Sequence, residues 1–111
     1  MLKYGSMNAR NRTSKPIALD EHVAAHVAEL FRAFSDTSRV RIISVLAKGE
    51  QHVTALSEAI GLSQSAVSHH LRALRQLRLV WTHKEGRQVF YYLDDHVASL
   101  FQQGLDHIQH G

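Results

Sequence analysis

Apolar residues recur every three or four positions in four successive stretches between Ile17 and about residue 77, which predicts four helices. Asp20 stands where it can cap the first helix, and the segment SDTSR separates that helix from the second. Thr54 can cap the third helix, which ends at Gly61, and Ser63 can cap the fourth. The apolar positions of the first two helices are Val23, Val27, Leu30, Phe31 and Phe34, followed by Val40, Ile43 and Leu46.

The period of the pattern changes after the fourth helix. LVWTH and RQVFYYL are rich in Val, Tyr, Phe and Trp, which favour strands. KEG lies between them and predicts a tight turn, with Gly86 at the position that tolerates positive φ. Helical spacing returns from about Asp95 to Gln109. The sequence therefore predicts a mainly α protein with one small β-hairpin.

A short helix, a turn, a longer helix and a hairpin follow one another in the order of a winged helix-turn-helix. In the longer helix, Val67, Leu71 and Leu74 share one face and predict its buried stripe. The opposite face begins with small polar residues, which allow a helix to approach base edges, and its arginines and the hairpin tip can contact phosphates. The predicted DNA-binding residues are Gln64, Ser65, Ser68, His69, Arg72, Arg75, Lys84 and Arg87.

The charge is unevenly distributed along the chain. Of a net charge of +3, residues 1–16 and residues 62–92 each carry +4, whereas residues 17–61 carry −2 and residues 93–111 carry −3. Two basic zones favour a polyanionic partner, although a modest positive charge also serves solubility. The alternative to a DNA-binding surface is a solvated helix face beside an ordinary basic turn. Helix order, turn, face chemistry and charge together favour DNA.

The length of 111 residues suits one compact domain. Residues 1–16 are polar, basic and without period, which predicts a disordered arm before a winged-helix DNA-binding and dimerisation domain at residues 17–111. Met7 is a candidate native start, which would make residues 1–6 an addition from cloning. No stretch has the pattern of a transmembrane helix or a signal peptide. We therefore expect a cytoplasmic protein without a membrane partner.

The sequence contains no cysteine and nine histidines. The lack of cysteine excludes disulfides, thiolate metal sites, thiol redox sensing and cysteine nucleophiles. Histidine is the commonest metal ligand in proteins. The histidines are therefore the candidate metal ligands of this chain.

Three segments together resemble a known family: ELFRAFSDTSRVRIISVL, LSEAIGLSQSAVSHHLRALRQLRLV and KEGRQVFYYL. They closely resemble the ArsR/SmtB family of metal-responsive repressors, and the similarity covers almost everything from about residue 23 to the end. The resemblance implies a winged-helix homodimer that binds a palindromic operator in double-stranded DNA. It also implies that metal binding releases the operator and derepresses genes for metal efflux or sequestration.

The last predicted helix carries His96, His107 and His110 on one stripe, beside an apolar stripe. His96 and His107 are roughly 16 Å apart along the axis at ~1.5 Å per residue, so one chain cannot bring both to one metal ion. Two antiparallel copies of the helix would bring them together, and two-fold symmetry would produce two equal sites per dimer. The predicted dimer interface consists of Val97, Leu100, Phe101, Gly104 and Ile108.

The family resemblance implies the ligand set. Zinc sensors of the family carry Asp-x-His at the start of this helix and His-x-x-His or His-x-x-Glu at its end. The matching residues are Asp94 and His96 from one chain with His107 and His110 from the other. Asp95 is the alternative to Asp94, since the segment between the wing and this motif is one residue shorter than in relatives.

Three imidazoles and one carboxylate suit Zn(II) as an allosteric effector, and Co(II) can imitate it. Four protein ligands would leave no open position for a metal-activated water, which argues against an enzyme. The alternative for these histidines is a solvated role that favours the helix dipole. The alternative function is a repressor of the same fold that responds to nickel or to a non-metal signal.

The family also implies a route from the metal to DNA. The free ring N–H of His107 would bond to a backbone carbonyl near Arg78, at the end of the recognition helix. His22 and His26 are four residues apart and could chelate a further metal, although solvated histidines are the simpler interpretation. The remaining histidines, His52, His69, His70 and His83, are isolated in the sequence. We expect His69 to face the DNA, and His70 and His83 to be surface or half-packed residues.

Overall fold

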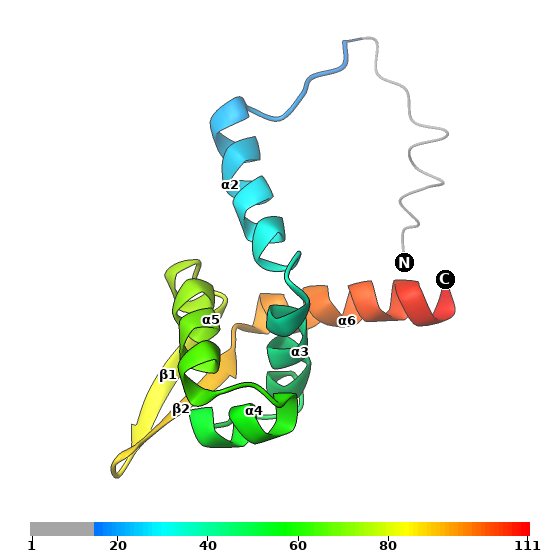
Figure 1. The fold of residues 1–111 in the computed structure, drawn as a ribbon. Coiled ribbons are helices and arrows are strands. Elements are labelled where there is room, and N and C mark those ends of the chain that lie inside the picture. The colour runs from blue at the N-terminus through cyan, green and yellow to red at the C-terminus, as the bar shows by residue number, and fades with distance from the viewer. Residues whose placement is uncertain (1–14) are drawn as a thin grey trace.

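The structure, a computed structural model, describes residues 15–111, so nearly all of the predicted basic arm lies outside the described residues. Five helices and one antiparallel hairpin follow in the predicted order, as Figure 1 shows. The fold class, mainly α with a small hairpin, is confirmed. The elements are α2 (Glu21–Ala33), α3 (Thr37–Leu46), α4 (Val53–Ile60), α5 (Gln64–Gln76), β1 (Val80–Glu85), β2 (Gln88–Leu93) and α6 (Asp95–His110).

The core lies between α3, α4, α5 and the base of the hairpin. Burial of branched aliphatic side chains is the main stabilising contribution in a domain of this size. The predicted stripe of α5 is confirmed, since Val67, Leu71 and Leu74 are all buried. The side chains that are almost completely buried are Ile42, Ile43, Leu56, Val67, Leu71, Leu74 and Val80.

Side chains at the predicted positions cap two of the helices. Asp20 accepts hydrogen bonds from the first turn of α2, and the Ser63 hydroxyl accepts the Ala66 backbone N–H. The predicted Thr54 cap is wrong. Helix α4 begins at Val53, and the Nδ1 atom of His52 accepts the Ala55 N–H at 3.2 Å. An imidazole nitrogen thus takes the place expected for a hydroxyl, so His52 does have a partner.

The hairpin turn has two residues, because Glu85 still pairs with Gln88 across the strands. Gly86 has φ 61°, as predicted for the turn. At the other end of the hairpin, the Asp94 backbone N–H donates to the Leu79 carbonyl at 3.1 Å. The start of α6 is therefore joined to the segment that leaves α5.

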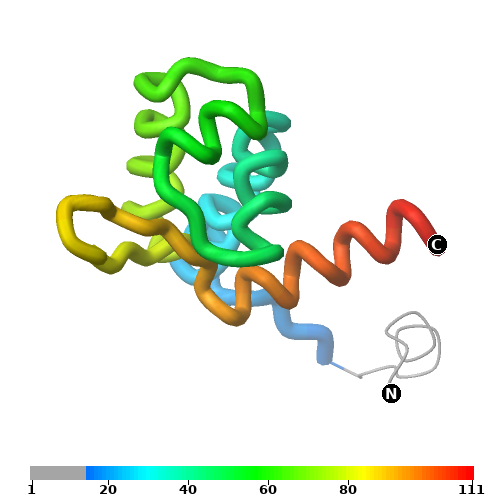
Figure 2. The backbone as a smooth tube through the Cα atoms, turned by 90° about the horizontal axis from the view of Figure 1, so that it is seen from below, coloured from blue at the N-terminus to red at the C-terminus, as the bar shows by residue number. Residues whose placement is uncertain are grey.

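Helices α2 and α6 extend away from the core, and Figure 2 shows the second half of α6 projecting on the side opposite the hairpin. Only the first turns of α6 contribute to the core. Val97 is 5% exposed and packs inside its own chain, which corrects its assignment to the dimer interface. Among the described residues, the structure contains no helix long and apolar enough to cross a bilayer.

Candidate DNA-binding surface and metal centre

Helix α5 presents a polar face on the side away from the core. Its stability does not depend on that face, because the buried stripe and the Ser63 cap hold the helix. Of the predicted DNA-binding residues on α5, Ser68 is half-buried and the others are exposed: Gln64, Ser65, His69, Arg72 and Arg75. This face can therefore reach a ligand without unfolding the helix.

Contacts from neighbouring elements fix the helix-turn-helix unit. Gly61 ends α4 with φ 80°, a conformation that glycine adopts without steric cost. The Arg41 guanidinium donates to the Ile60 carbonyl at 3.1 Å, so α3 holds the end of α4. The Arg39 Nε–H donates to Nδ1 of His70 at 3.2 Å, which links α3 to α5. His70 is therefore a half-buried positioning residue rather than an isolated one.

The hairpin provides the wing. Lys84 and Arg87 lie near the two-residue turn, and both are exposed. Their charges can contact a phosphate backbone, as predicted, since nothing among the described residues forms an ion pair with either. The geometry of the wing and of α5 is thus compatible with one continuous DNA-binding surface.

Asp94 organises the start of α6. Its Oδ2 atom accepts the His96 backbone N–H at 3.0 Å, which caps the helix. The Trp81 indole N–H donates to Oδ1 at 3.3 Å. The indole hydrogen bond, aided by the His96 N–H, holds the pKa of the Asp94 carboxyl below its usual value. Asp94 is therefore a charged carboxylate at neutral pH.

The side chain of His96 lies directly beside Asp94. Its Nδ1 atom is 3.3 Å from Oδ2 of Asp94, and its side chain is 99% exposed. Both residues border a hollow of about 360 Å³ between α6 and the end of α5. Asp95 borders a different hollow, of about 430 Å³, together with Glu50 and His83. The two neighbouring aspartates thus face different parts of the molecule.

His107 and His110 are exposed in the last turns of α6. Within the described part of one chain, neither belongs to a group of three potential metal ligands. One chain therefore does not assemble the predicted site, as the helical distance between its two halves requires.

An apolar groove of about 550 Å³ runs between α6, α2 and the start of α3. Four of the predicted interface residues line it, together with residues that the sequence analysis did not assign there. Ile108 is 81% exposed and Phe31 is 51% exposed, which is unusual for such large apolar side chains. The groove is lined by Phe31, Phe34, Val40, Leu100, Phe101, Gln103, Gly104, Leu105 and Ile108.

Residues 36–82, which span α3 to the first part of β1, match the sequence model described as "Bacterial regulatory protein, arsR family". The chain is also 46% identical over 105 residues to the HTH-type transcriptional regulator NmtR of Mycobacterium tuberculosis. The aligned region covers 94% of this chain and 86% of that protein. The chain belongs to the arsR family of bacterial regulatory proteins.

Two further comparisons agree with the arsR assignment. The transcriptional repressor SmtB homolog of Synechocystis is 43% identical over 99 residues, covering 88% of this chain and 75% of that protein. A homodimeric winged helix-turn-helix DNA-binding domain from Mycobacterium bovis superposes with a TM-score of 0.72 at 29% identity, covering 86% of this chain and 96% of that chain. This arsR-family chain is thus a winged-helix transcriptional regulator and not an enzyme.

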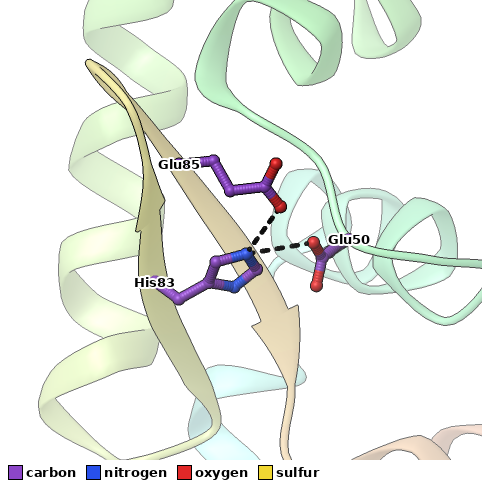
Figure 3. A network of polar contacts seen from close by, with 3 residues as sticks. All are labelled: Glu50, His83 and Glu85. Atoms are coloured by element: carbon purple, nitrogen blue, oxygen red, sulfur yellow. Dashed lines mark hydrogen bonds and ion pairs between the residues drawn. The ribbon is translucent and has the colours of Figure 1, made fainter.

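The structure of this arsR-family chain also contains a cluster that sequence analysis missed. Figure 3 shows His83 pointing between Glu50 and Glu85, with Nε2 3.3 Å from a carboxylate oxygen of each. The prediction that His83 is isolated is therefore wrong, whereas its half-packed position is confirmed. The spacing of His83 and Glu85 on one strand was a usable signal, because alternate residues share a face. Glu50 lies far away in the sequence and gave no such signal.

Proposed function

We propose that this arsR-family protein is a zinc-responsive repressor that binds a palindromic operator as a homodimer. Zinc binding at two inter-subunit sites releases the operator and derepresses metal efflux or sequestration genes, and Co(II) can replace zinc. The observation that carries the proposal is the layout of α6. Asp94 and His96 lie at one end of the helix, His107 and His110 lie at the other, and the exposed apolar groove runs between them.

The groove supports an antiparallel pairing of two α6 helices. Its large exposed side chains would leave water when a second copy covers them, at about 25 cal/mol per Å² of apolar area. Gly104 lies in the middle of the groove and permits close approach of the partner helix. The homodimeric M. bovis domain, which has the same fold, further supports a dimer.

The donor set fits zinc. Zinc bonds of about 2.0–2.1 Å in a tetrahedral shell place two ligand atoms about 3.3–3.4 Å apart. Nδ1 of His96 and Oδ2 of Asp94 are separated by 3.3 Å before any metal is added. Asp94 borders the same hollow as His96, whereas Asp95 borders another, which favours Asp94 as the carboxylate ligand.

The surface of α5 and the wing supports operator binding. We assign direct contacts with base edges to the first turn of α5, where Gln64, Ser65 and Ser68 offer short polar groups. Arg72, Arg75, Lys84 and Arg87 are assigned to phosphates, which position a protein on DNA without specifying its sequence. His69 lies between these two groups.

Two contacts connect the proposed metal site to the segment after the DNA-binding helix and to β1. The Asp94 N–H bonds to the Leu79 carbonyl directly after α5, and the Asp94 carboxylate accepts the Trp81 indole N–H. Bound zinc would hold both α6 helices in one relation. The two recognition helices of a dimer must lie about one DNA turn apart, ~34 Å, to bind both half-sites. If the zinc-bound arrangement of the α6 helices holds the recognition helices at another distance, the affinity for the operator falls. By linkage, DNA then lowers zinc affinity by the same factor.

The experiment is a titration of operator binding by fluorescence anisotropy, with DNA selected from random sequence by the metal-free protein. We expect zinc and cobalt to weaken operator binding at least about fivefold, the lower range of typical allosteric coupling. Nickel tests the alternative sensor, and a response to none of the three metals would favour a non-metal signal.

His107→Asn separates metal binding from DNA binding. The variant should bind the operator without metal as the wild type does, and zinc should no longer release it, because the imidazole and its free N–H are absent. Gln102→Ala, at an exposed position of α6 outside the groove and not a proposed ligand, is the matched control and should still respond. Zinc-driven release by His107→Asn would show that this residue is not in the switch.

A further inference from the structure

We propose that the wing carries a second zinc site, separate from the one on α6, formed by His83, Glu50 and Glu85. These residues come from β1 and from the loop between α3 and α4, and they form a group of three metal-ligating side chains within the described residues. The site would join the wing to the body of the same chain.

The distances in the cluster suit the ligands of one metal ion, although they also fit long hydrogen bonds or ion pairs between the side chains. Nε2 of His83 is 3.3 Å from Oε1 of Glu50 and 3.3 Å from Oε2 of Glu85. A charge-assisted hydrogen bond is typically about 2.7–2.9 Å long. Two ligands of a tetrahedral zinc are about 3.3–3.4 Å apart. All ligand atoms of the group lie within 4.8 Å of one another, so small side-chain movements would let one ion bind all three.

The backbone holds the three side chains in place. His83 and Glu85 alternate on β1 and therefore share a face of the hairpin. Gln51, directly after Glu50, exchanges two backbone hydrogen bonds with Tyr91 of β2, at 3.1 and 2.8 Å. This isolated bridge fixes the Glu50 loop against the strand beside β1. The ligands are thus arranged before the metal arrives, which lowers the entropy lost on binding.

Packing orients the His83 ring. The ring stacks on Phe90, its cross-strand partner, with centroids 5.7 Å apart and planes 19° apart. Nε2 is the nitrogen that faces both carboxylates (Figure 3). His83 and Glu50 also border the open hollow of about 430 Å³ that contains Asp95. A water molecule from this open hollow can therefore complete a four-coordinate shell.

The ligand chemistry selects a divalent cation of the zinc type. One imidazole with two carboxylates is a hard to borderline donor set, without sulfur, and three protein ligands with an open position is a known zinc arrangement. The two glutamates place negative charge beside the cations Lys84 and Arg87 of the wing. Zinc in the cluster would neutralise that charge and tie the wing to the α3–α4 loop.

The test is to measure the number of zinc ions bound per chain. The full chain is first equilibrated with zinc, and free metal is then removed. We expect two zinc ions per chain in the wild type and one in Glu50→Gln/Glu85→Gln. The α6 variant His107→Asn/His110→Asn should also retain one. A variant with all four substitutions gives the background, and Glu58→Gln, an exposed glutamate on α4, is the matched control.

A second variant tests the same site with both glutamates left in place. His83→Phe retains a ring against Phe90 but removes the nitrogen, so it should lose the same zinc ion with an unchanged circular dichroism spectrum. The proposal is overturned if His107→Asn/His110→Asn binds no zinc above background, or if Glu50→Gln/Glu85→Gln binds as much as the wild type. Failure of the α6 site gives a different pattern, in which the α6 variant retains all the zinc that the wild type binds.

Discussion

A single residue, Asp94, joins three functions at the junction of the wing and α6. Its carboxylate caps the helix, accepts the Trp81 indole N–H, and lies 3.3 Å from the His96 ring. The following residue, Asp95, borders the opposite hollow, beside Glu50 and His83. Of the two adjacent carboxylates, Asp94 is therefore the one that lies beside His96.

Asp94→Asn and Asp95→Asn separate these roles. Asparagine caps a helix about as well as aspartate, so both variants should fold. Asp94→Asn should weaken zinc binding at the α6 site at least about tenfold, the lower range for changes around a metal. Asp95→Asn should change that affinity less than about twofold. A competition titration against a chromophoric chelator measures both, and the reverse order would identify Asp95 as the ligand.

At the residue scale, the hydrogen-bond partners of a side chain were predictable where the partners are close in the sequence. Ser63 and Asp20 were found as caps because each bonds to N–H groups within three residues. The His52 cap was missed because an imidazole caps only in the right tautomer and orientation, which composition does not show. The pairing of His83 with Glu50 was missed because the loop and the strand meet only after folding.

At the scale of elements, α6 is one helix with two environments. Its later turns project beyond the body (Figure 2). Val97 in its first turns packs into the core, whereas Ile108 in its later turns is exposed. The spacing of apolar residues predicted the stripe correctly. It did not show where the helix leaves its own chain, because core-facing and partner-facing positions are equally apolar. That is why Val97 was assigned to the interface.

Ile108→Asp should separate the dimer without unfolding the chain. Burying one isoleucine contributes about 1.5–3 kcal/mol, and symmetry places it in the interface twice, so dimerisation should weaken about a hundredfold or more. Sedimentation velocity measures the change. Gln109→Asp, with the same charge on a neighbouring exposed position, should remain dimeric. An Ile108→Asp protein that dimerises as the wild type does would place the interface elsewhere.

At the scale of the whole molecule, the wing and the end of α6 that carries His107 and His110 lie on different sides of the body. The wing extends to one side of the body and α6 to the other (Figures 1 and 2). The order of elements and the family were predictable from the sequence, because periodicity, turns and the motif of α5 agree. The antiparallel arrangement of two α6 helices was inferred only from two-fold symmetry, since it depends on contacts between chains that one chain does not contain.

The salt dependence of operator affinity tests the phosphate contacts. Each neutralised phosphate contributes about −0.9 to the slope of log affinity against log salt, and a homodimer repeats every contact. Arg72→Ala and Arg87→Ala should therefore each make the slope shallower by about 1.8. Arg32→Ala, an exposed arginine on α2, should leave it unchanged. Unchanged slopes for the first two variants would exclude phosphates as their targets.

The hydrogen bond between the Asp94 N–H and the Leu79 carbonyl closes the hairpin at its base, beside the last strand pair, Val80 with Leu93. The two ends of the hairpin, at Leu79 and Asp94, therefore lie side by side. Residues can consequently be added to or removed from the tip in cross-strand pairs while α5 and α6 keep their positions. The wing is therefore a module that evolution can lengthen, shorten or recharge to suit a new operator, with α6 and its link to α5 left intact.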